Sequence, residues 1–486
     1  MTNERRVKIV ATLGPAVANP HRLRELIAAG VDVVRINAAH GSAGHRERFI
    51  DEVRSAALEQ GKQVPILFDL QGLKIRTGPL SEGETAVPIA RGSVVELVAG
   101  PEPSTPQRIG VGYQALMEVI EPGSRVLISD GLIELLIERV ENGVARARVG
   151  RGGPLLGRQG VTLPGAPIKD GAMTDADRED VRFACAAGVD YLGLSFINDA
   201  SDLDLARDVA ASCVGGGAIP GLVAKIERPE ALANLREIAG HADGIMVARG
   251  DLGVQLPPER VPRAQKQIIG VANRAGLPVI TATQMLESMI TQPVATRAET
   301  SDVANAVWDG TDAVMLSAET AVGKYPIEAV QTMDRIIREV EREGPVRSQA
   351  AASQPEVASE DPTQVFADAI ARAAYALSDH TPIEHLVVFT QTGTAVRRVA
   401  KYRPFPPIIA VAADELVARR LNLIWGVRSV VVPIEENPDE MFRKAGRAII
   451  DAGIAVEGEY ALLVGSLPMT HEAGRTNAVH FRKLGT

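Results

Sequence analysis

Four charged residues at or near the ends of short apolar runs could together carry out chemistry on an anionic substrate. They are Arg35, Lys225, Glu227 and Asp251. The carboxylates of Glu227 and Asp251 offer oxygen ligands of the kind that Mg²⁺ or Mn²⁺ prefers. Lys225 precedes Glu227 by two residues, so on a strand both side chains point to the same face. A lysine beside a divalent cation stabilises charge shared between a leaving and an accepting group, as phosphoryl transfer requires.

Two further observations complete this candidate catalytic set. Arg35 supplies a planar guanidinium that binds phosphate or carboxylate oxygens through two parallel hydrogen bonds. Thr283 supplies a hydroxyl that is too weak an acid to donate a proton alone, but is adequate within a relay of water molecules. The cysteines Cys185 and Cys213 have no histidine pair nearby, which disfavours zinc. We therefore expect a magnesium or manganese centre.

Eight short β-branched runs, separated mostly by amphipathic stretches, would position these residues. Nearly continuous apolar strands between helical patterns indicate a parallel sheet covered by helices, and eight such units close a (β/α)₈ TIM barrel. Active sites of this fold lie at the carboxyl ends of the strands, where the polar residues stand. The predicted fold class is therefore α/β. The runs cover residues 8–14, 31–39, 64–70, 189–196, 221–227, 243–251, 278–285 and 312–319.

The chain pattern predicts two additional domains. After the third strand, a Gly- and Pro-rich region with alternating Val and Leu predicts an inserted β-rich lid over the barrel mouth. After the barrel, a segment without apolar period reads as a linker, followed by a C-terminal α/β domain. The predicted division is barrel 1–71, lid 72–164, barrel 165–343, linker 344–361 and C-terminal domain 362–486.

Charge and hydropathy exclude several classes of partner. The chain has 52 Lys and Arg against 61 Asp and Glu, a formal charge of −9, which argues against nucleic-acid and anionic-membrane binding. No run approaches 18 uninterrupted apolar residues, and the first residues do not resemble a signal peptide. We therefore expect a cytoplasmic protein with neither a membrane nor a nucleic-acid partner.

Several long motifs resemble the pyruvate kinase family, in order and along nearly the whole chain. The most specific are MVARGDLG at 246–253 and TATQMLESM at 281–289, accompanied by VKIVATLGPA, RINAAHG and VAKIERPEAL. The resemblance implies a glycolytic phosphotransferase that moves the phosphoryl group of phosphoenolpyruvate to ADP, giving pyruvate and ATP. It also implies a divalent metal, a C-terminal effector domain and a homotetramer.

The resemblance assigns roles to the residues at the strand ends. Glu227 and Asp251 match the metal ligands, Lys225 the group that stabilises the transferring phosphoryl, and Thr283 a member of the relay that protonates the enolate. Arg35 matches a ligand of the phosphoryl group. The matching positions also imply two binding sites. The substrate carboxylate would bind where a helix begins, at Ala248, Arg249, Gly250 and Asp251. The nucleotide would bind at Asn37, His40 and Arg76.

The stretch DLQGLKIR resembles the potassium-independent branch of the family. Asn37 and Asp69 match oxygen ligands of the family's potassium site, whereas Ala39, Leu70 and Lys74 replace its Ser, Thr and Glu. We expect the Lys74 ammonium, together with Asp69 and Asn37, to supply the charge that potassium supplies elsewhere, so that potassium is not required. The alternative is a solvated lysine at the lid hinge.

Two further positions bear on the lid and on regulation. Gln159 stands where the family usually has a lysine near the nucleotide, so a positive charge of the lid is missing. The segment 389–404 resembles the family's effector loop, in which amides and hydroxyls before a helix hold the phosphate of a sugar phosphate or nucleotide. A plain capped helix is the alternative. The loop residues are Thr390, Gln391, Thr392, Gly393 and Thr394.

Two other functions compete with the kinase. One is another barrel enzyme that handles phosphoenolpyruvate or pyruvate, such as a mutase or a metal-dependent aldolase; the inserted lid and Arg76 speak against it. The other is a catalytically silent regulatory protein that binds sugar phosphates. The joint presence of Lys225, Glu227, Asp251 and Thr283 with Arg35 speaks against that.

Overall fold

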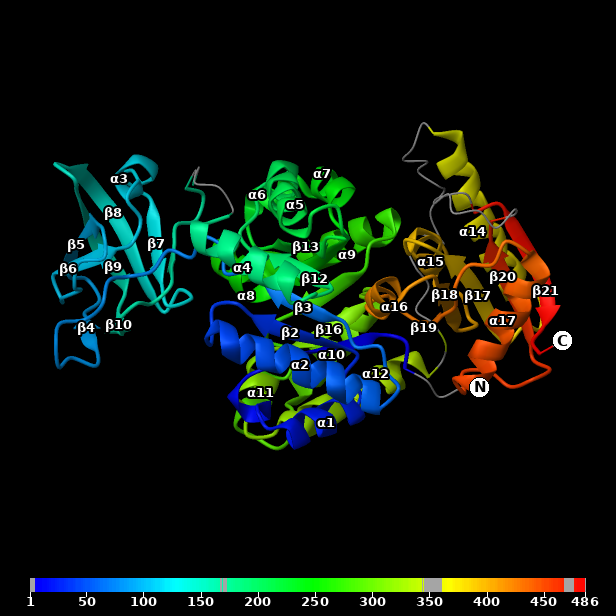
Figure 1. Cartoon of the computed structure of the whole chain (residues 1–486). Helices are drawn as coiled ribbons and strands as arrows, with labels where there is room; N and C mark the ends of the chain where they lie inside the picture. Colours follow the sequence, from blue (N-terminus) through cyan, green and yellow to red (C-terminus); the bar gives the residue numbers. More distant parts are fainter. Residues whose placement is uncertain are drawn as a thin grey trace.

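The chain forms three bodies arranged in a row (Figure 1). The inserted β sheet lies at one end, the barrel in the middle and the C-terminal domain at the other end. This computed structural model describes residues 5–166, 168, 173–342, 344, 361–466 and 476–485. The linker expected at 344–361 therefore lies, apart from its two end residues, outside the described residues.

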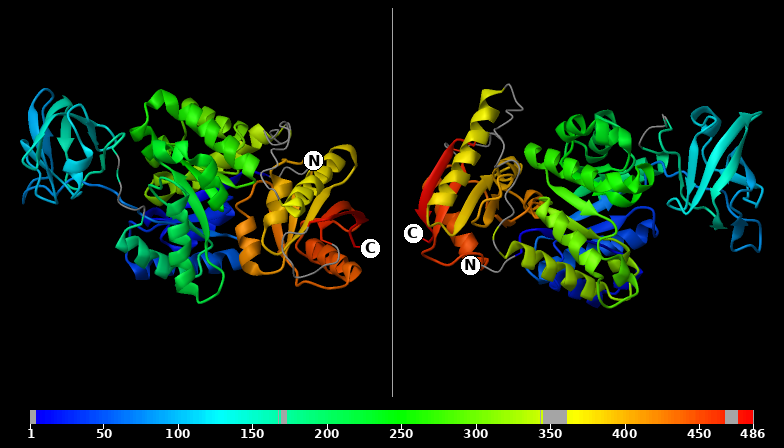
Figure 2. Two further views of the ribbon diagram at one scale, coloured as in Figure 1. Left: turned by 90° about the horizontal axis from the view of Figure 1, so that it is seen from above. Right: turned by 180° about the vertical axis from the view of Figure 1, so that it is seen from behind.

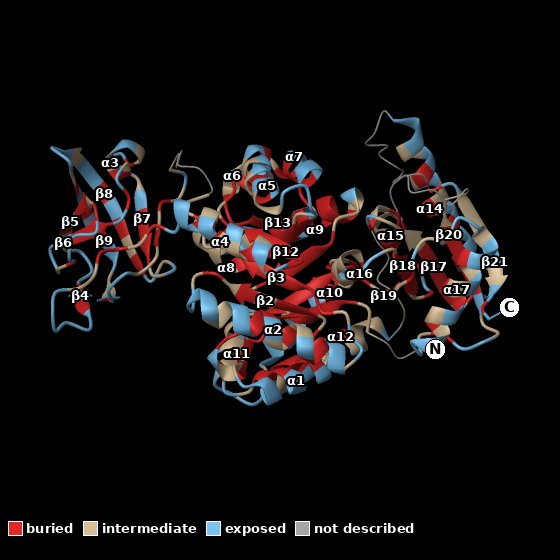
Figure 3. Cartoon of the chain, in the orientation of Figure 1, coloured by how far each residue is buried: buried red, intermediate tan, exposed pale blue. Residues whose placement is uncertain are grey.

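The central body is a closed barrel of parallel strands, as the sequence predicts. Its strands follow the order β1-β16-β15-β14-β13-β12-β3-β2. The strands are almost wholly buried, which explains their continuous apolar composition (Figure 3). Their bounds are β1 (Lys8–Thr12), β2 (Val33–Asn37), β3 (Ile66–Asp69), β12 (Tyr191–Leu194), β13 (Gly221–Ile226), β14 (Gly244–Ala248), β15 (Val279–Ala282) and β16 (Ala313–Leu316).

Helices cover the outside of the barrel, and local sequence signals explain several of their ends. Thr174 and Thr296 each form a capping box with an acidic residue three positions later. The helices are α1 (Pro20–Ala28), α2 (Ala43–Glu59), α4 (Asp175–Ala186), α5 (Ala200–Val214), α6 (Pro229–Ala233), α7 (Leu235–His241), α8 (Arg249–Gln255), α9 (Val261–Ala275), α10 (Arg297–Trp308), α11 (Ala318–Ala321) and α12 (Pro326–Glu341). Short 3₁₀ turns are η1 (Pro15–Val17), η2 (Pro258–Arg260) and η3 (Glu287–Ile290).

The inserted β unit leaves the barrel after β3 and returns before α4. It contains a six-stranded sheet in the order β11-β7-β8-β9-β5-β6 and a two-stranded sheet β10-β4. Its elements are β4 (Val87–Ile89), β5 (Val94–Ala99), β6 (Arg108–Val111), α3 (Leu116–Val119), β7 (Arg125–Ile128), β8 (Ile133–Glu141), β9 (Val144–Arg151), β10 (Gly153–Leu155) and β11 (Val161–Thr162). In Figures 1 and 2 it stands out from the barrel, which is the arrangement expected of an open lid.

The C-terminal body is a five-stranded sheet in the order β19-β18-β17-β20-β21. The strand β21 runs antiparallel to β20 and was not predicted, because its residues lack a buried apolar run. The elements are α14 (Pro362–His380), β17 (His385–Thr390), α15 (Thr394–Ala400), β18 (Ile408–Ala412), α16 (Glu415–Leu421), β19 (Val427–Val431), α17 (Pro438–Asp451), β20 (Tyr460–Gly465) and β21 (Ala478–Lys483).

Hydrogen bonds and ion pairs attach the C-terminal body to the amino ends of the barrel strands. Lys8 at the start of β1 donates from Nζ to the Val427 carbonyl at 2.7 Å. Asp190, immediately before β12, pairs with Arg419 at 2.8 Å. The carboxyl ends of the strands therefore remain on the side from which the inserted sheet emerges. Across the described residues, no helix is long and apolar enough to cross a membrane.

Candidate active site at the carboxyl ends of the barrel strands

A buried ammonium lies at the centre of the barrel mouth. The Nζ of Lys225 on β13 is 2.8 Å from Glu227 Oε1 and 3.1 Å from Asp69 Oδ1. Lys225 and Glu227 share one side of the chain, as their spacing predicts. Asp69 comes from the end of β3, which β12 separates from β13 in the barrel. Side chains from strands that are not adjacent therefore meet at one ammonium. All three side chains are nearly inaccessible to solvent.

Arg35 meets the same carboxylate from the opposite side. Its Nε donates to Asp69 Oδ2 at 2.7 Å, and its Nη1 donates to the Thr12 hydroxyl at 3.1 Å. The pairing of β2 with β3 places the two strand ends side by side, because Asn37 stands opposite Asp69. The mouth therefore holds two cations, Lys225 and Arg35, which Asp69 bridges.

Burial and mutual attraction shift the pKa values of this cluster. Burial acts to lower the pKa of Lys225, but Asp69 and Glu227 outweigh it and the pKa is raised, so the ammonium stays charged. Burial acts to raise the pKa of Asp69, yet Lys225 and Arg35 together lower it. Burial raises the pKa of Glu227; Lys225 opposes the increase and Asp251 adds to it. The site thus keeps a charged ammonium at Lys225, which an anionic ligand could contact.

Glu227 and Asp251 form the candidate metal site. Asp251 lies in the first turn of α8, close enough for its charge to act on Glu227. The Glu227 Oε1 atom is buried and lies 2.8 Å from the Lys225 ammonium, but it accepts no hydrogen bond of ordinary geometry from the described residues. Among the described residues, no group of three or more His, Cys, Asp or Glu side chains could hold a metal. Two carboxylates fit Mg²⁺ or Mn²⁺, which leave further positions to water and substrate.

Thr283 lies beside the beginning of α8. It follows β15 with a φ of 67°, in the left-handed region. Its Oγ1 accepts a hydrogen bond from the Gly250 amide at 2.7 Å and donates one to the Ala282 carbonyl at 2.7 Å. The predicted relay residue and the predicted carboxylate-binding segment 248–251 are therefore in direct contact.

The Arg249 side chain lies away from the predicted substrate. It is buried and pairs with Asp302 of α10, with Nη1 2.6 Å from Asp302 Oδ2. Its backbone, at the start of α8, is the part that the predicted carboxylate site would use.

The predicted potassium substitute is not assembled in this conformation. The Lys74 side chain is exposed, and the Asp69 oxygens pair instead with Arg35 and Lys225. The Asn37 Oδ1 accepts a hydrogen bond from the Ala39 amide at 3.0 Å. The description of Lys74 as a solvated hinge residue therefore fits the open structure.

The three predicted nucleotide residues lie on two different bodies. Asn37 and the exposed His40 follow β2 at the barrel mouth. Arg76 lies where the chain enters the inserted unit, at the predicted hinge, and donates from Nη1 to the Arg158 carbonyl at 3.3 Å. Gln159 pairs with Thr77 through the backbone at 2.8 Å, so it belongs to the same hinge.

Ser195 is a site residue to which sequence reasoning gave no role. The Lys225 ammonium donates to its Oγ at 2.6 Å, and that hydroxyl donates to the Leu70 carbonyl at 2.7 Å. Its position at the end of the fourth predicted strand was the available signal. Glu319, at the end of the eighth, instead accepts hydrogen bonds from the Leu286 and Ser317 amides and has a structural role.

The predicted effector loop lines a cavity between the C-terminal domain and the barrel. Thr390 Oγ1 accepts from the Gly393 amide at 2.8 Å, and α15 begins at Thr394. The cavity has a volume of about 220 Å³, and Thr392, Arg397 and Arg420 line the side that the C-terminal domain forms. Its barrel side is formed at the amino ends of β12, β13, β14 and β15 by Tyr191, Gly221, Asp243 and Pro278.

Comparison with known proteins gives one consistent family. The model described as "Pyruvate kinase, barrel domain" matches residues 4–330, and "Pyruvate kinase, alpha/beta domain" matches residues 368–480. A pyruvate kinase of Agrobacterium vitis is 42% identical over 476 residues, covering 98% of this chain and 96% of that protein. One of Methylorubrum extorquens is 41% identical over 479 residues, covering 99% and 97%. The crystal structure of a pyruvate kinase from Cryptosporidium parvum aligns with a TM-score of 0.90 and 32% identity, covering 99% and 96%.

Proposed function

This chain belongs to the pyruvate kinase family and is a phosphotransferase, and we propose that it transfers the phosphoryl group of phosphoenolpyruvate to ADP, giving pyruvate and ATP. The observation that carries the proposal is the buried Lys225 ammonium, 2.8 Å from the carboxylate of Glu227. A preorganised cation in a site shielded from water stabilises a transferring phosphoryl group without reorganisation.

The residues at the barrel mouth have different roles in the proposed reaction. Arg35 and Lys225 hold and stabilise the phosphoryl group, and the backbone at 248–251 receives the substrate carboxylate. Glu227 and Asp251 would hold Mg²⁺ or Mn²⁺, which supplies further positive charge to the substrate oxygens. Thr283 takes part in the relay that protonates the enolate after transfer.

The nucleotide site is completed by the lid. Asn37 and His40 are on the barrel, and Arg76 would approach the ADP phosphates when the inserted sheet closes. Closure would also exclude water from the phosphoryl group, which prevents hydrolysis. The open position in Figure 1 suits entry of substrate.

A coupled assay with phosphoenolpyruvate, ADP and Mg²⁺ tests the function. We expect ATP and pyruvate in equal amounts. Failure to form ATP would sink the kinase proposal; rearrangement or cleavage of an organic acid without nucleotide would favour a mutase or aldolase. Binding of sugar phosphates without any turnover would favour a silent regulatory protein.

Potassium independence is the second part of the proposal. Lys74 is positioned on the hinge that closes the lid, so closure would carry its ammonium towards Asp69 and Asn37. The side chains at the site support the proposal: Ala39 and Leu70 stand where the family's potassium site has a Ser and a Thr, so two side-chain oxygens for potassium are missing from this chain.

The third part is regulation through the loop 390–394. A sugar phosphate or nucleotide effector would bind there, where hydroxyls meet Arg397 and Arg420 in the 220 Å³ cavity. The cavity also touches the four strands whose opposite ends lead to Ser195, Lys225, Asp251 and Thr283. We further propose a homotetramer that works in the cytoplasm.

A further inference from the structure

An unusual turn holds Thr283 at the mouth. Thr283 and Gln284 both have left-handed backbone conformations, with φ values of 67° and 54°. Such a conformation is rare for any residue with a side chain, and especially for a β-branched threonine. Two in succession persist only where surrounding contacts hold them. The turn therefore requires a partner that this part of the structure must supply.

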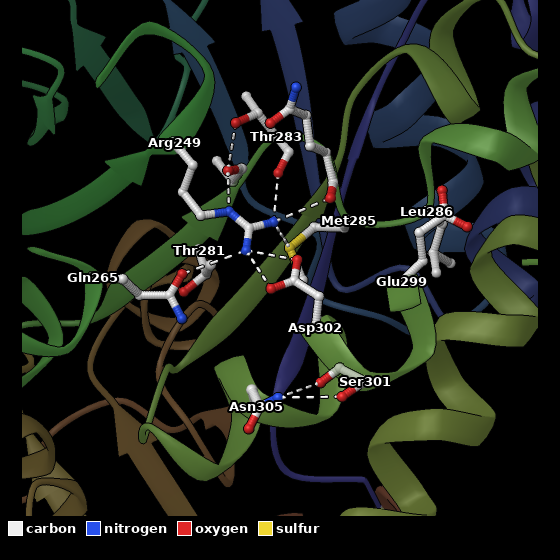
Figure 4. Close-up of polar contacts among 12 residues, drawn as sticks. Arg249, Gln265, Thr281, Thr283, Met285, Leu286, Glu299, Ser301, Asp302 and Asn305 are labelled. Atoms are coloured by element: carbon white, nitrogen blue, oxygen red, sulfur yellow. Dashed lines mark hydrogen bonds and ion pairs between the residues drawn. The ribbon is translucent and has the colours of Figure 1, made fainter. Parts of the chain in front are cut away.

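The Arg249 guanidinium is that partner. It donates from Nε to the Ala282 carbonyl at 3.3 Å, and from Nη2 to the carbonyls of Thr283 at 2.6 Å and Gln284 at 3.3 Å. Three consecutive carbonyls are thus gathered by one planar group, as Figure 4 shows around Thr283. A guanidinium has five donors in a fixed plane, so it can hold several acceptors in one geometry.

The other edge of the guanidinium is held by two further elements. Nη1 donates to Asp302 Oδ1 of α10 at 2.8 Å and to Gln265 Oε1 of α9 at 3.4 Å (Figure 4). Asp302 balances the charge of Arg249, whose side chain is only 9% exposed. The guanidinium therefore has little freedom to move.

Gly250, the residue after Arg249, contacts the Thr283 hydroxyl directly. The Gly250 amide donates to Thr283 Oγ1 at 2.7 Å. The first turn of α8 thus fixes both the backbone and the hydroxyl of Thr283, and continues into the metal ligand proposed at Asp251. Displacing the carbonyls would move the hydroxyl relative to Asp251.

We propose that Arg249 is a positioning residue that clamps the 282–284 turn, and thereby aims the Thr283 hydroxyl at the enolate intermediate. This inference rests on the proposed function. In the relay, a proton passes from solvent through water and the hydroxyl to the enolate carbon, and the hydroxyl ends as it began. The Arg249 side chain itself touches no substrate, because it lies among α8, α9, α10 and the turn.

Exchange of the pyruvate methyl protons with D₂O isolates this proton transfer. It is followed by proton NMR with Mg²⁺ and inorganic phosphate, over hours, so that residual rates are readable. Arg249→Lys keeps the charge near Asp302 but cannot span three carbonyls. We expect exchange to fall about 100-fold, in the range of general acid–base effects. Single-turnover ATP formation and the half-saturating phosphoenolpyruvate concentration should change less than about threefold.

A double-mutant cycle with Thr283→Ala separates positioning from general damage. If Arg249 acts through Thr283, Arg249→Lys should lower exchange in the wild-type background but not further in the Thr283→Ala background. Equal losses in both backgrounds would overturn the proposal. So would a loss of ATP formation equal to the loss of exchange.

Two further variants guard against misfolding. Asp309→Ala removes the carboxylate that accepts from Gln265 Nε2 at 2.9 Å and from the Lys266 ammonium, so it disturbs the contact between α9 and the end of α10 without removing any hydrogen-bond partner of Arg249. Exchange should remain within about twofold of wild type. If Arg249→Lys does not fold, Asp302→Asn weakens the clamp instead, and should lower exchange only when Thr283 is present. Wild type that forms no ATP would refute the proposed function, whereas active wild type with additive losses would refute only this inference.

Discussion

The Lys225 ammonium lies 3.1 Å from Asp69 Oδ1, although the two residues are far apart in the chain. Arg35 pairs with the other oxygen of the same carboxylate at 2.7 Å. Asp69 therefore holds together the two cations that would receive the phosphoryl group. The carboxylate acts on the site through these two partners.

Asp69→Asn should destabilise the protein in a pH-dependent way. The folded-state pKa of Asp69 is lowered: burial opposes this, but Lys225 and Arg35 prevail. Its stabilising contribution is thus complete above the unfolded pKa of about 3.9, and is lost as the pH falls through the folded value. We expect a loss of about 3 kcal/mol at pH 7, since a buried pair loses one partner.

Urea unfolding of both proteins at pH 7 and pH 3 measures this loss, which should be smaller at pH 3. Asp51→Asn, on the exposed face of α2, serves as the matched control and should show no such difference. A loss that is the same at both pH values would contradict the assignment of the charge interaction to Asp69.

Lys225→Met should abolish most of the activity while leaving metal binding measurable. The variant removes the buried cation that would stabilise the transferring group, so kcat should fall about 1000-fold. The coupled assay gives kcat and the half-saturating phosphoenolpyruvate concentration. Lys266→Met is the control, because that lysine also pairs with an acidic residue, Asp309, but is exposed on α9. A kcat within tenfold of wild type would remove Lys225 from its proposed role.

Glu227→Gln and Asp251→Asn should each weaken binding of a divalent metal at least about tenfold, since each removes one of two carboxylate ligands. Electron paramagnetic resonance of free Mn²⁺ measures the affinity directly, without turnover. Glu230→Gln changes an exposed carboxylate three residues beyond Glu227 and should bind Mn²⁺ as wild type does. Unchanged affinity in both site variants would place the metal elsewhere.

The Lys74 proposal concerns monovalent cations. Wild-type activity should be the same in tetramethylammonium and in potassium, whereas Lys74→Glu should lose about tenfold in tetramethylammonium and recover with potassium, because a cation is then required beside two carboxylates. Arg91→Glu, an exposed charge reversal on the inserted unit, should need no potassium. Many-fold activation of wild type by potassium would overturn the internal-cation interpretation and leave the kinase assignment intact.

The effector cavity makes a separate prediction. Glucose 6-phosphate and AMP are tested as effectors. For whichever is active, Arg420→Gln should raise the concentration that gives half of the effect about tenfold, because a charge-assisted hydrogen bond to phosphate is lost. The measurement is the phosphoenolpyruvate concentration that gives half of the maximal rate, determined in the presence of each compound. Arg443→Gln, on the exposed face of α17, should respond as wild type does. An unaltered response in Arg420→Gln would exclude this cavity as the effector site.

Much of the barrel and its mouth follows from the sequence alone. Continuous apolar runs between helical patterns suffice for a parallel barrel, because both faces of such strands must be buried. Within that fold, strand ends identify Arg35, Lys225 and Glu227 as neighbours in the mouth, since the fold itself brings the carboxyl ends together. The alternation of two residues on β13 likewise predicts that Lys225 and Glu227 share a side.

Only the tertiary structure decided which charges pair and which side chains act at a distance. Asp69 meets Lys225 and Arg35, while Lys74, nearer in the chain, is exposed, because the partner choice depends on strand register and on the position of the lid. Arg249 reads in the sequence as a substrate residue, yet its side chain clamps the turn at Thr283. That role depends on backbone angles and on the meeting of α8, α9 and α10, neither of which is encoded in a local pattern.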